Sequence, residues 1–160
     1  LGQEMAGYAT GEVFFVSQAL GFRHSHLDSS GYSYDQKSEA IVPEDAVDFL
    51  VKDEQERVFL TSMVACLFAR SVYKEELLAE CLHSVGYSTL AETIPKVSQG
   101  LQERRWQIRL STGYDPTTVK SPKRFKEVNT WKGSIDGKML DQLHQKYAQK
   151  IVGMGRRETV

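Results

Sequence analysis

Apolar side chains that recur every three or four residues constrain the fold of this chain most, because that spacing places them on one face of an α-helix. In residues 73–86 they are Leu77, Leu78, Cys81, Leu82 and Val85, and in residues 136–153 they are Leu140, Leu143, Tyr147 and Ile151. Gly86 and Gly153 stand where helices commonly end, and Asp136 is suited to cap the second segment. Both segments are therefore predicted to be amphipathic helices.

Residues 53–72, DEQERVFLTSMVACLFARSV, form a third predicted helix. Its apolar side chains cover almost the whole circumference: Val58, Phe59, Met63, Val64, Cys66, Leu67 and Phe68. We expect such a helix to be surrounded by protein.

Proline begins two further predicted helices. Pro43 precedes two acids in residues 43–51, and Pro95 opens residues 95–110, where Gly100 interrupts the apolar pattern. The spacing of Thr89 and Glu92 predicts one short turn ahead of Pro95. Residues 21–38 and 111–134 are rich in Gly, Ser, Asp and Pro and are predicted to be loops. The expected fold class is all-α, a single multihelical domain over residues 1–160 with long irregular loops.

Composition excludes several classes of function. The formal net charge of -1 argues against nucleic-acid binding, which usually shows a basic excess. No apolar run approaches the roughly 20 residues that span a bilayer, so no membrane segment is expected. Two cysteines are too few for a disulfide framework and favour a cytoplasmic location. The start of the sequence has neither an initiator Met nor a signal-peptide pattern, and we expect it to belong to a longer protein.

His24, His26 and Asp28 in RHSHLD are candidate metal ligands. In an extended segment this spacing puts all three side chains on one side, and two imidazoles with a carboxylate suit zinc or iron. The pattern is similar to the H-x-H-x-D opening of metallo-β-lactamase-like hydrolases, with VFFV upstream as a candidate strand. That family has a histidine where Ser29 follows here. The alternative is a polar loop whose histidines bond to the backbone.

Other reactive side chains have structural interpretations. A free cysteine usually packs as a small hydrophobe, so Cys66 and Cys81 are both candidates for the core. His83 and His144 stand beside charged residues and indicate solvated helix faces. Arg104 and Arg105, beside Trp106, fit either an anion site or a solvated face.

Six motifs in order resemble the C-terminal part of the aldehyde ferredoxin oxidoreductase family, whose members are tungsten enzymes. They are GYATG (7–11), GFRHSHLD (21–28), TSMVAC (61–66), VGY (85–87), ERRWQIRL (103–110) and SPKRF (121–125). In the family, a YATS-like helix leads to an active-site loop with an arginine and a histidine. A D-x-x-G-L/V-C motif then supplies the last cysteine ligand of a [4Fe-4S] cluster.

The resemblance implies a role for each matching residue. His26 corresponds best to the catalytic histidine, with His24 as the second choice, and Cys66 to the cluster ligand. Arg23 and Thr61 fall on positions near the tungsten or molybdenum bispterin cofactor. The implied reaction is oxidation of an aldehyde, or a related small carbonyl substrate, with electron transfer to ferredoxin. The implied partners are upstream domains of the same chain, and a homo-oligomer is also allowed.

The sequence departs from the family at several points. Thr61 replaces the aspartate of D-x-x-G-L/V-C and Val64 replaces its glycine, and the family's upstream C-x-x-C-x-x-x-C run is missing. The 160 residues alone are therefore expected to be inactive. Two alternatives stay open: a non-catalytic helical interaction module, and a mononuclear metal hydrolase that uses His24, His26 and Asp28.

Overall fold

The computed structural model describes residues 8–23 and 25–156, which form helices joined by loops, together with one short hairpin. The α-helices are α1 (Glu12–Leu20), α2 (Gly31–Lys37), α3 (Pro43–Ser62), α4 (Glu75–Ser84), α5 (Ser88–Glu92), α6 (Ile94–Ser111) and α7 (Gly137–Gly155). Two 3-10 turns, η1 (Leu67–Ala69) and η2 (Lys123–Glu127), and the strands β1 (Asn129–Thr130) and β2 (Gly133–Ser134) complete the order. The predicted all-α fold class is confirmed.

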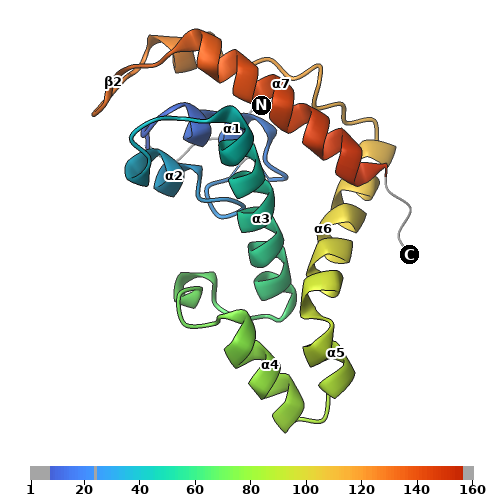
Figure 1. Cartoon of the computed structure of the whole chain (residues 1–160). Helices are drawn as coiled ribbons and strands as arrows, with labels where there is room; N and C mark the ends of the chain where they lie inside the picture. The colour runs from blue at the N-terminus through green and yellow to red at the C-terminus, as the bar shows by residue number, and fades with distance from the viewer. Residues whose placement is uncertain (1–7, 24, 157–160) are drawn as a thin grey trace.

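The long helices α3 and α6 pack side by side and connect two parts of the molecule (Figure 1). At the upper end, α7 lies across both helices, and α1 packs against α7 and α2. At the lower end, η1, α4 and α5 surround the point where α3 ends and α6 begins. The histidine loop between α1 and α2 belongs to the upper part, and the Cys66 segment belongs to the lower part.

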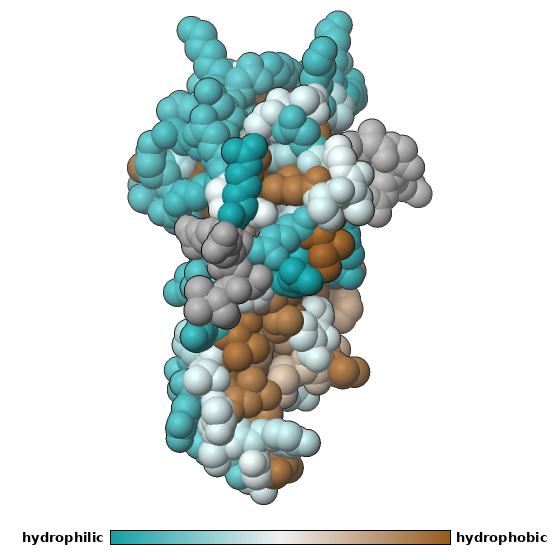
Figure 2. All heavy atoms as spheres, turned by 90° about the vertical axis from the view of Figure 1, so that its right-hand side faces the viewer, coloured by the Kyte–Doolittle hydropathy of each residue, from teal (hydrophilic) through white to brown (hydrophobic). Residues whose placement is uncertain are grey.

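Each part has its own hydrophobic core. The upper cluster includes the buried side chains Phe14, Leu50, Trp106, Leu140 and Tyr147. The lower cluster consists of Phe59, Leu60, Leu78, Leu82, Ala91 and Ile94. On the side where α5 and α6 lie, a band of apolar residues covers the lower half while the upper half is mostly hydrophilic (Figure 2). On this face, polar residues therefore cover the lower part less completely than the upper part.

Helix α7 follows its sequence pattern closely. The side chain of Asp136 accepts hydrogen bonds from the backbone amides of Lys138 (2.8 Å) and Met139 (3.2 Å), which confirms the predicted cap. The four apolar residues predicted for its inner face are all buried. The expected end at Gly153 is wrong, because the helix continues through the buried Met154 to Gly155.

Helix α1 occupies the segment that was a candidate strand. All its residues from Val13 to Leu20 are buried. A short apolar run of this kind is typical of a buried strand and of a buried helix alike, so its sequence does not distinguish the two. The first backbone amides of α1 are capped by a residue that is distant in the sequence. The Asp35 carboxylate on α2 accepts hydrogen bonds from the amides of Val13 (3.2 Å) and Phe14 (2.9 Å). The strand interpretation is therefore wrong.

The helix predicted over residues 53–72 is wrong at both ends. Residues 43–51 and 53–62 form the single helix α3, which begins at Pro43 with Glu44 and Asp45 in its first turn. It ends at Ser62, and Val64 then adopts φ 57°, a conformation that no α-helix contains. The remaining residues, with Cys66, turn into η1 outside the helix.

The predicted loops contain short elements, and some predicted positions differ. Residues 21–38 include α2, and residues 111–134 include η2 and the antiparallel pair β1–β2. Gly86 has φ 88° and terminates α4 as predicted, but Cys81 is exposed, not on the core face. His83 is exposed as expected, whereas His144 is half-buried and burial lowers its pKa.

Candidate functional site

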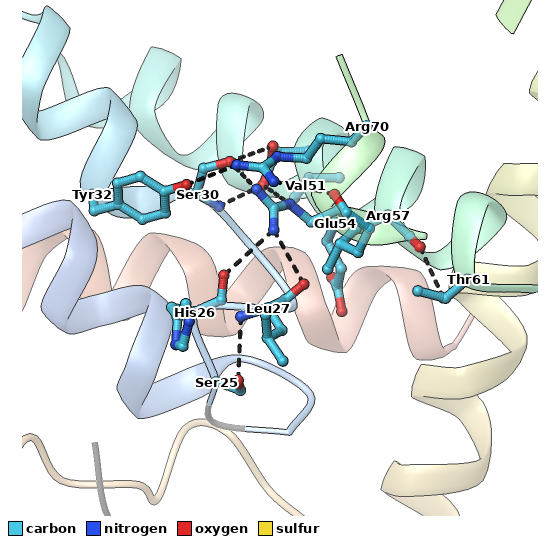
Figure 3. A network of polar contacts seen from close by, with 12 residues as sticks. Ser25, His26, Leu27, Ser30, Tyr32, Val51, Glu54, Arg57, Thr61 and Arg70 are labelled. Carbon is cyan, nitrogen blue, oxygen red and sulfur yellow. Dashed lines mark hydrogen bonds and ion pairs between the residues drawn. The ribbon is translucent and has the colours of Figure 1, made fainter. Parts of the chain in front are cut away.

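Arg57 on α3 is the centre of a polar network that fixes the histidine loop (Figure 3). Its Nη1 donates to the backbone carbonyls of His26 (3.4 Å) and Leu27 (3.2 Å), and its Nη2 donates to Ser30 Oγ. Its Nε forms an ion pair with Asp53 at 2.8 Å. The guanidinium is nearly inaccessible to water, so these charge-assisted bonds hold the loop firmly against α3.

Asp53 completes the same anchor. Its carboxylate accepts hydrogen bonds from the backbone amide of Ser30 (2.5 Å) and from Ser30 Oγ (2.7 Å). Asp53 and Arg57 are one helical turn apart on α3 and act together on the start of α2. The loop that carries the candidate catalytic histidine is therefore positioned by two side chains of α3.

His26 has its carbonyl and its ring in different surroundings. The carbonyl oxygen faces Arg57 (Figure 3). The half-buried imidazole packs edge-on against Tyr8, with 5.3 Å between ring centroids, and Tyr8 lies 5.8 Å from Tyr32. His26 is thus held at its backbone and packed among aromatic rings. His24 lies outside the described residues.

Asp28 pairs with arginine. Its buried carboxylate accepts from Arg23 Nε (2.7 Å) and from the Arg23 backbone amide (2.7 Å), and Arg105 Nη2 lies 3.9 Å away. Arg105 also stacks on Phe22, with its Cζ 4.0 Å from the ring centroid. Arg104 is exposed and bonds to Gln107, so the two neighbouring arginines do not converge on one anion. Arg23 is half-exposed at the loop's edge.

Cys66 lies in an exposed turn at the lower end of α3. The prediction of a buried helix around it is wrong, because α3 ends four residues earlier, at Ser62. Thr61 is exposed in the last turn of α3, and its hydroxyl donates to the carbonyl of Arg57 at 2.8 Å. Val64, between Thr61 and Cys66, is 93% exposed.

Arg70 connects the Cys66 turn with the histidine loop. Its Nη1 donates to the carbonyl of Leu67 (3.1 Å), and its Nη2 donates to Tyr32 Oη (3.0 Å) on α2. Tyr32 in turn lies against Tyr8, which contacts the His26 ring. The structure therefore brings His26 and the Cys66 turn into one connected region, and Arg70 is a link that sequence patterns did not indicate.

Glu54 is a buried acid that the sequence analysis also missed. Its Oε2 accepts from Gln102 Nε2 (2.9 Å) and Trp106 Nε1 (3.1 Å), while its Oε1 has no partner in the part of the chain that is described. Burial raises the pKa of this carboxyl from 4.5 to about 7. The periodicity of α3 could have indicated its inward position, because Glu54 stands one turn after the buried Leu50.

The implied cofactors require ligands that this region does not provide. A [4Fe-4S] cluster needs four cysteine ligands, and here Cys66 is on the turn before η1 while Cys81 is on α4. Across residues 8–23 and 25–156, no three His, Cys, Asp or Glu side chains are grouped so that they could hold a metal ion. These residues therefore cannot hold the cluster alone, and no chemical step is assigned to it.

No family model matches this chain, and neither a curated protein nor a solved structure matches it significantly. The resemblance to the aldehyde ferredoxin oxidoreductases therefore rests on the motifs themselves. Within the described residues, none of the helices has the length and apolar character needed to cross a membrane.

Proposed function

We propose that this chain is a helical domain of an oxidoreductase of the aldehyde ferredoxin oxidoreductase type. The full enzyme would oxidise aldehydes or related small carbonyl compounds and pass electrons to ferredoxin. In this proposal the chain contributes Cys66 as one ligand of a [4Fe-4S] cluster and His26 as a residue of the active-site loop. Two free cysteines suit the reducing cytoplasm, where we place the enzyme.

The backbone at Val64 carries the proposal. Val64 has φ 57°, a left-handed conformation that β-branched residues rarely adopt and glycine adopts readily. In the D-x-x-G-L/V-C motif of the family, this same position is the glycine. A glycine permits this conformation, so the turn that leads to Cys66 is compatible with the family's motif, although this chain has a valine there.

The surroundings of Cys66 give further support. Val64, Phe68, Val72, Tyr73 and Leu77 are exposed large apolar residues, and we call this set the apolar face. We propose that these five side chains, which come from one short segment of the sequence, form a contact surface, because exposed apolar patches commonly mark a contact with another protein or domain. A cofactor-carrying domain that covers the apolar face would also exclude water from Cys66, and a cluster thiolate is tuned by such burial.

In this proposal, the side chains of this chain hold the His26 loop and the Cys66 turn in place. Arg57 and Asp53 fix the loop of His26, and Arg70 ties that loop to the Cys66 turn. The remaining three thiolates and the bispterin site would come from residues outside this sequence. When bound, the tungsten or molybdenum cofactor would supply the two-electron chemistry, and the cluster would transfer single electrons.

Metal content of the whole encoded protein, purified without oxygen, tests this proposal. We expect about four irons with matching sulfide and one tungsten or molybdenum per chain. Cys66→Ser should lose cluster iron, whereas Cys81→Ser, a change at the other exposed cysteine, should keep it. A well-folded protein without iron or heavy metal would refute the proposal.

A second candidate function is a non-catalytic helical interaction module, which the apolar face equally favours. The two candidate functions predict different effects of the same substitutions on partner binding and iron content. An interaction module would keep its partner after Cys66→Ser and lose it after Phe68→Asp, and it would hold no iron in either form.

A further inference from the structure

A cleft of about 600 Å³ lies between the α2–α3 surface and the η1–α4 segment. Its size falls within the range of about 300–1,000 Å³ that small-molecule sites occupy. Its lining includes four aromatic residues and two arginines: Tyr32, Phe49, Phe68, Tyr73, Arg57 and Arg70. The cleft is thus bounded by helices of both parts of the molecule and by the segment that follows Cys66.

Arg70 is the unusual charge in this cleft. It is half-buried, and both of its hydrogen bonds go to neutral oxygens, those of Leu67 and Tyr32. Among the residues that the structure describes, no carboxylate lies within ion-pair distance of it. Arg57, the other arginine of the cleft, is neutralised by Asp53. One positive charge inside the cleft therefore lacks a counter-charge.

The rim does not supply that counter-charge in a fixed position. The exposed acids Glu56, Glu75 and Glu76 stand there together with the exposed lysines Lys37 and Lys74. These side chains are solvated and of both signs, so they do not cancel the charge of a half-buried guanidinium. A planar carboxylate is the group that an arginine fork binds best.

Aromatic rings supply the remaining walls. Tyr32 and Phe49 come from the α2–α3 side, and Phe68 and Tyr73 come from the segment after Cys66. Phe68 is 83% exposed although it lines the cleft, so much of its ring is available to a ligand. Aromatic rings in such positions favour stacked or edge-to-face contacts with another ring.

We propose that this cleft binds a small molecule that combines an aromatic body with one carboxylate, and that the carboxylate pairs with Arg70. The aromatic body lies between the rings of the α2–α3 side and the ring of Phe68. This inference goes beyond the proposed function and does not depend on any metal chemistry, because every group that it uses belongs to the described part of this chain.

Calorimetric titration of the metal-free chain with 2-naphthoate tests the inference. We expect saturable binding of one 2-naphthoate per chain. Binding of the neutral 2-naphthalenemethanol should be at least tenfold weaker, because it offers no charge to Arg70. Arg70→Gln should weaken 2-naphthoate binding at least tenfold, and Phe68→Ala should weaken it severalfold.

One control variant separates charge from structure. Arg124→Gln removes an exposed charge on η2, which does not line the cleft, and should leave binding unchanged. Far-UV circular dichroism verifies that each variant is folded.

Three results would overturn the inference. The first is no saturable binding at millimolar 2-naphthoate, and the second is equal affinity in the folded Arg70→Gln variant. The third is binding of decanoate as tightly as 2-naphthoate, since a fatty acid carries the same carboxylate without an aromatic body.

Discussion

The replacement Glu54→Gln should make the protein more stable at pH 8 and leave it nearly unchanged at pH 5. Burial raises the pKa of Glu54 from 4.5 to about 7 in the folded protein, so between these values the unfolded chain releases a proton that the folded chain retains. Ionisation therefore favours the unfolded state, and stability falls as the pH rises through this window. The difference in pKa corresponds to about 3 kcal/mol, at about 1.4 kcal/mol per pKa unit.

Glutamine reproduces the protonated acid. Its amide oxygen can accept the bonds from Gln102 and Trp106 that Glu54 Oε2 accepts, and its amide nitrogen takes the place of Oε1, which has no partner among the described residues. The nearby charges of Arg105 and Asp28 are the same in both proteins. Asp35, whose pKa burial raises to about 6, also titrates in both proteins, and its contribution cancels in the comparison.

Urea unfolding at pH 5, 6, 7 and 8, followed by circular dichroism, measures the effect. The advantage of the variant should be within about 1 kcal/mol of zero at pH 5 and should grow toward about 3 kcal/mol at pH 8. If the two proteins lose stability in parallel between pH 5 and pH 8, Glu54 does not titrate in this window and the reasoning is refuted.

Two further replacements test the backbone. Val64→Gly should stabilise the isolated chain by roughly 0.5–1 kcal/mol, because glycine relieves the left-handed conformation at an exposed side chain. Val72→Gly, at an exposed valine that has no positive φ, should give no such gain in the same urea experiment. Gly31→Ala should destabilise the protein by about 1–3 kcal/mol, because the new Cβ would lie 2.8 Å from the carbonyl oxygen of Val13. A thermal melt that is unchanged in Gly31→Ala would show that α1 and α2 are not packed this closely.

Sequence periodicity predicted that α4, α6 and α7 exist, but it predicted the inner face correctly only for α7, which Asp136 caps as expected. In α4, Leu78 and Leu82 are buried, whereas Leu77 and Val85 are exposed. The end of α3 could not be predicted in this way. Its apolar pattern continues past Ser62, and only the backbone conformation of Val64 shows that the chain leaves the helix there.

Short motifs nominated some residues of the candidate site, but they indicated none of its contacts and missed Arg57, Arg70 and Glu54. His26, Arg23, Asp28 and Cys66 were selected from short motifs, which contain no information on distant partners. The bonds from Arg57 to the His26 loop join residues about 30 positions apart in the sequence. The sequence analysis grouped Asp28 with the histidines as a candidate metal ligand. In the structure, the carboxylate of Asp28 instead forms an ion pair with Arg23. The spacing of residues in a short motif does not show which of several possible partners a side chain will bind.

The continuous course of α3 through both cores has a consequence for cooperativity. The helix contributes Leu50 to the upper cluster and Phe59 and Leu60 to the lower cluster, so about 15 Å of helix separates Leu50 from Leu60. Helix α6 makes the same connection, with Ile94 in the lower cluster and Trp106 in the upper cluster. Neither core can lose its helices without exposing the other. The lower core is therefore stabilised by the upper core through the two helices that they share. Backbone amides along both helices should exchange with solvent through a single shared opening event.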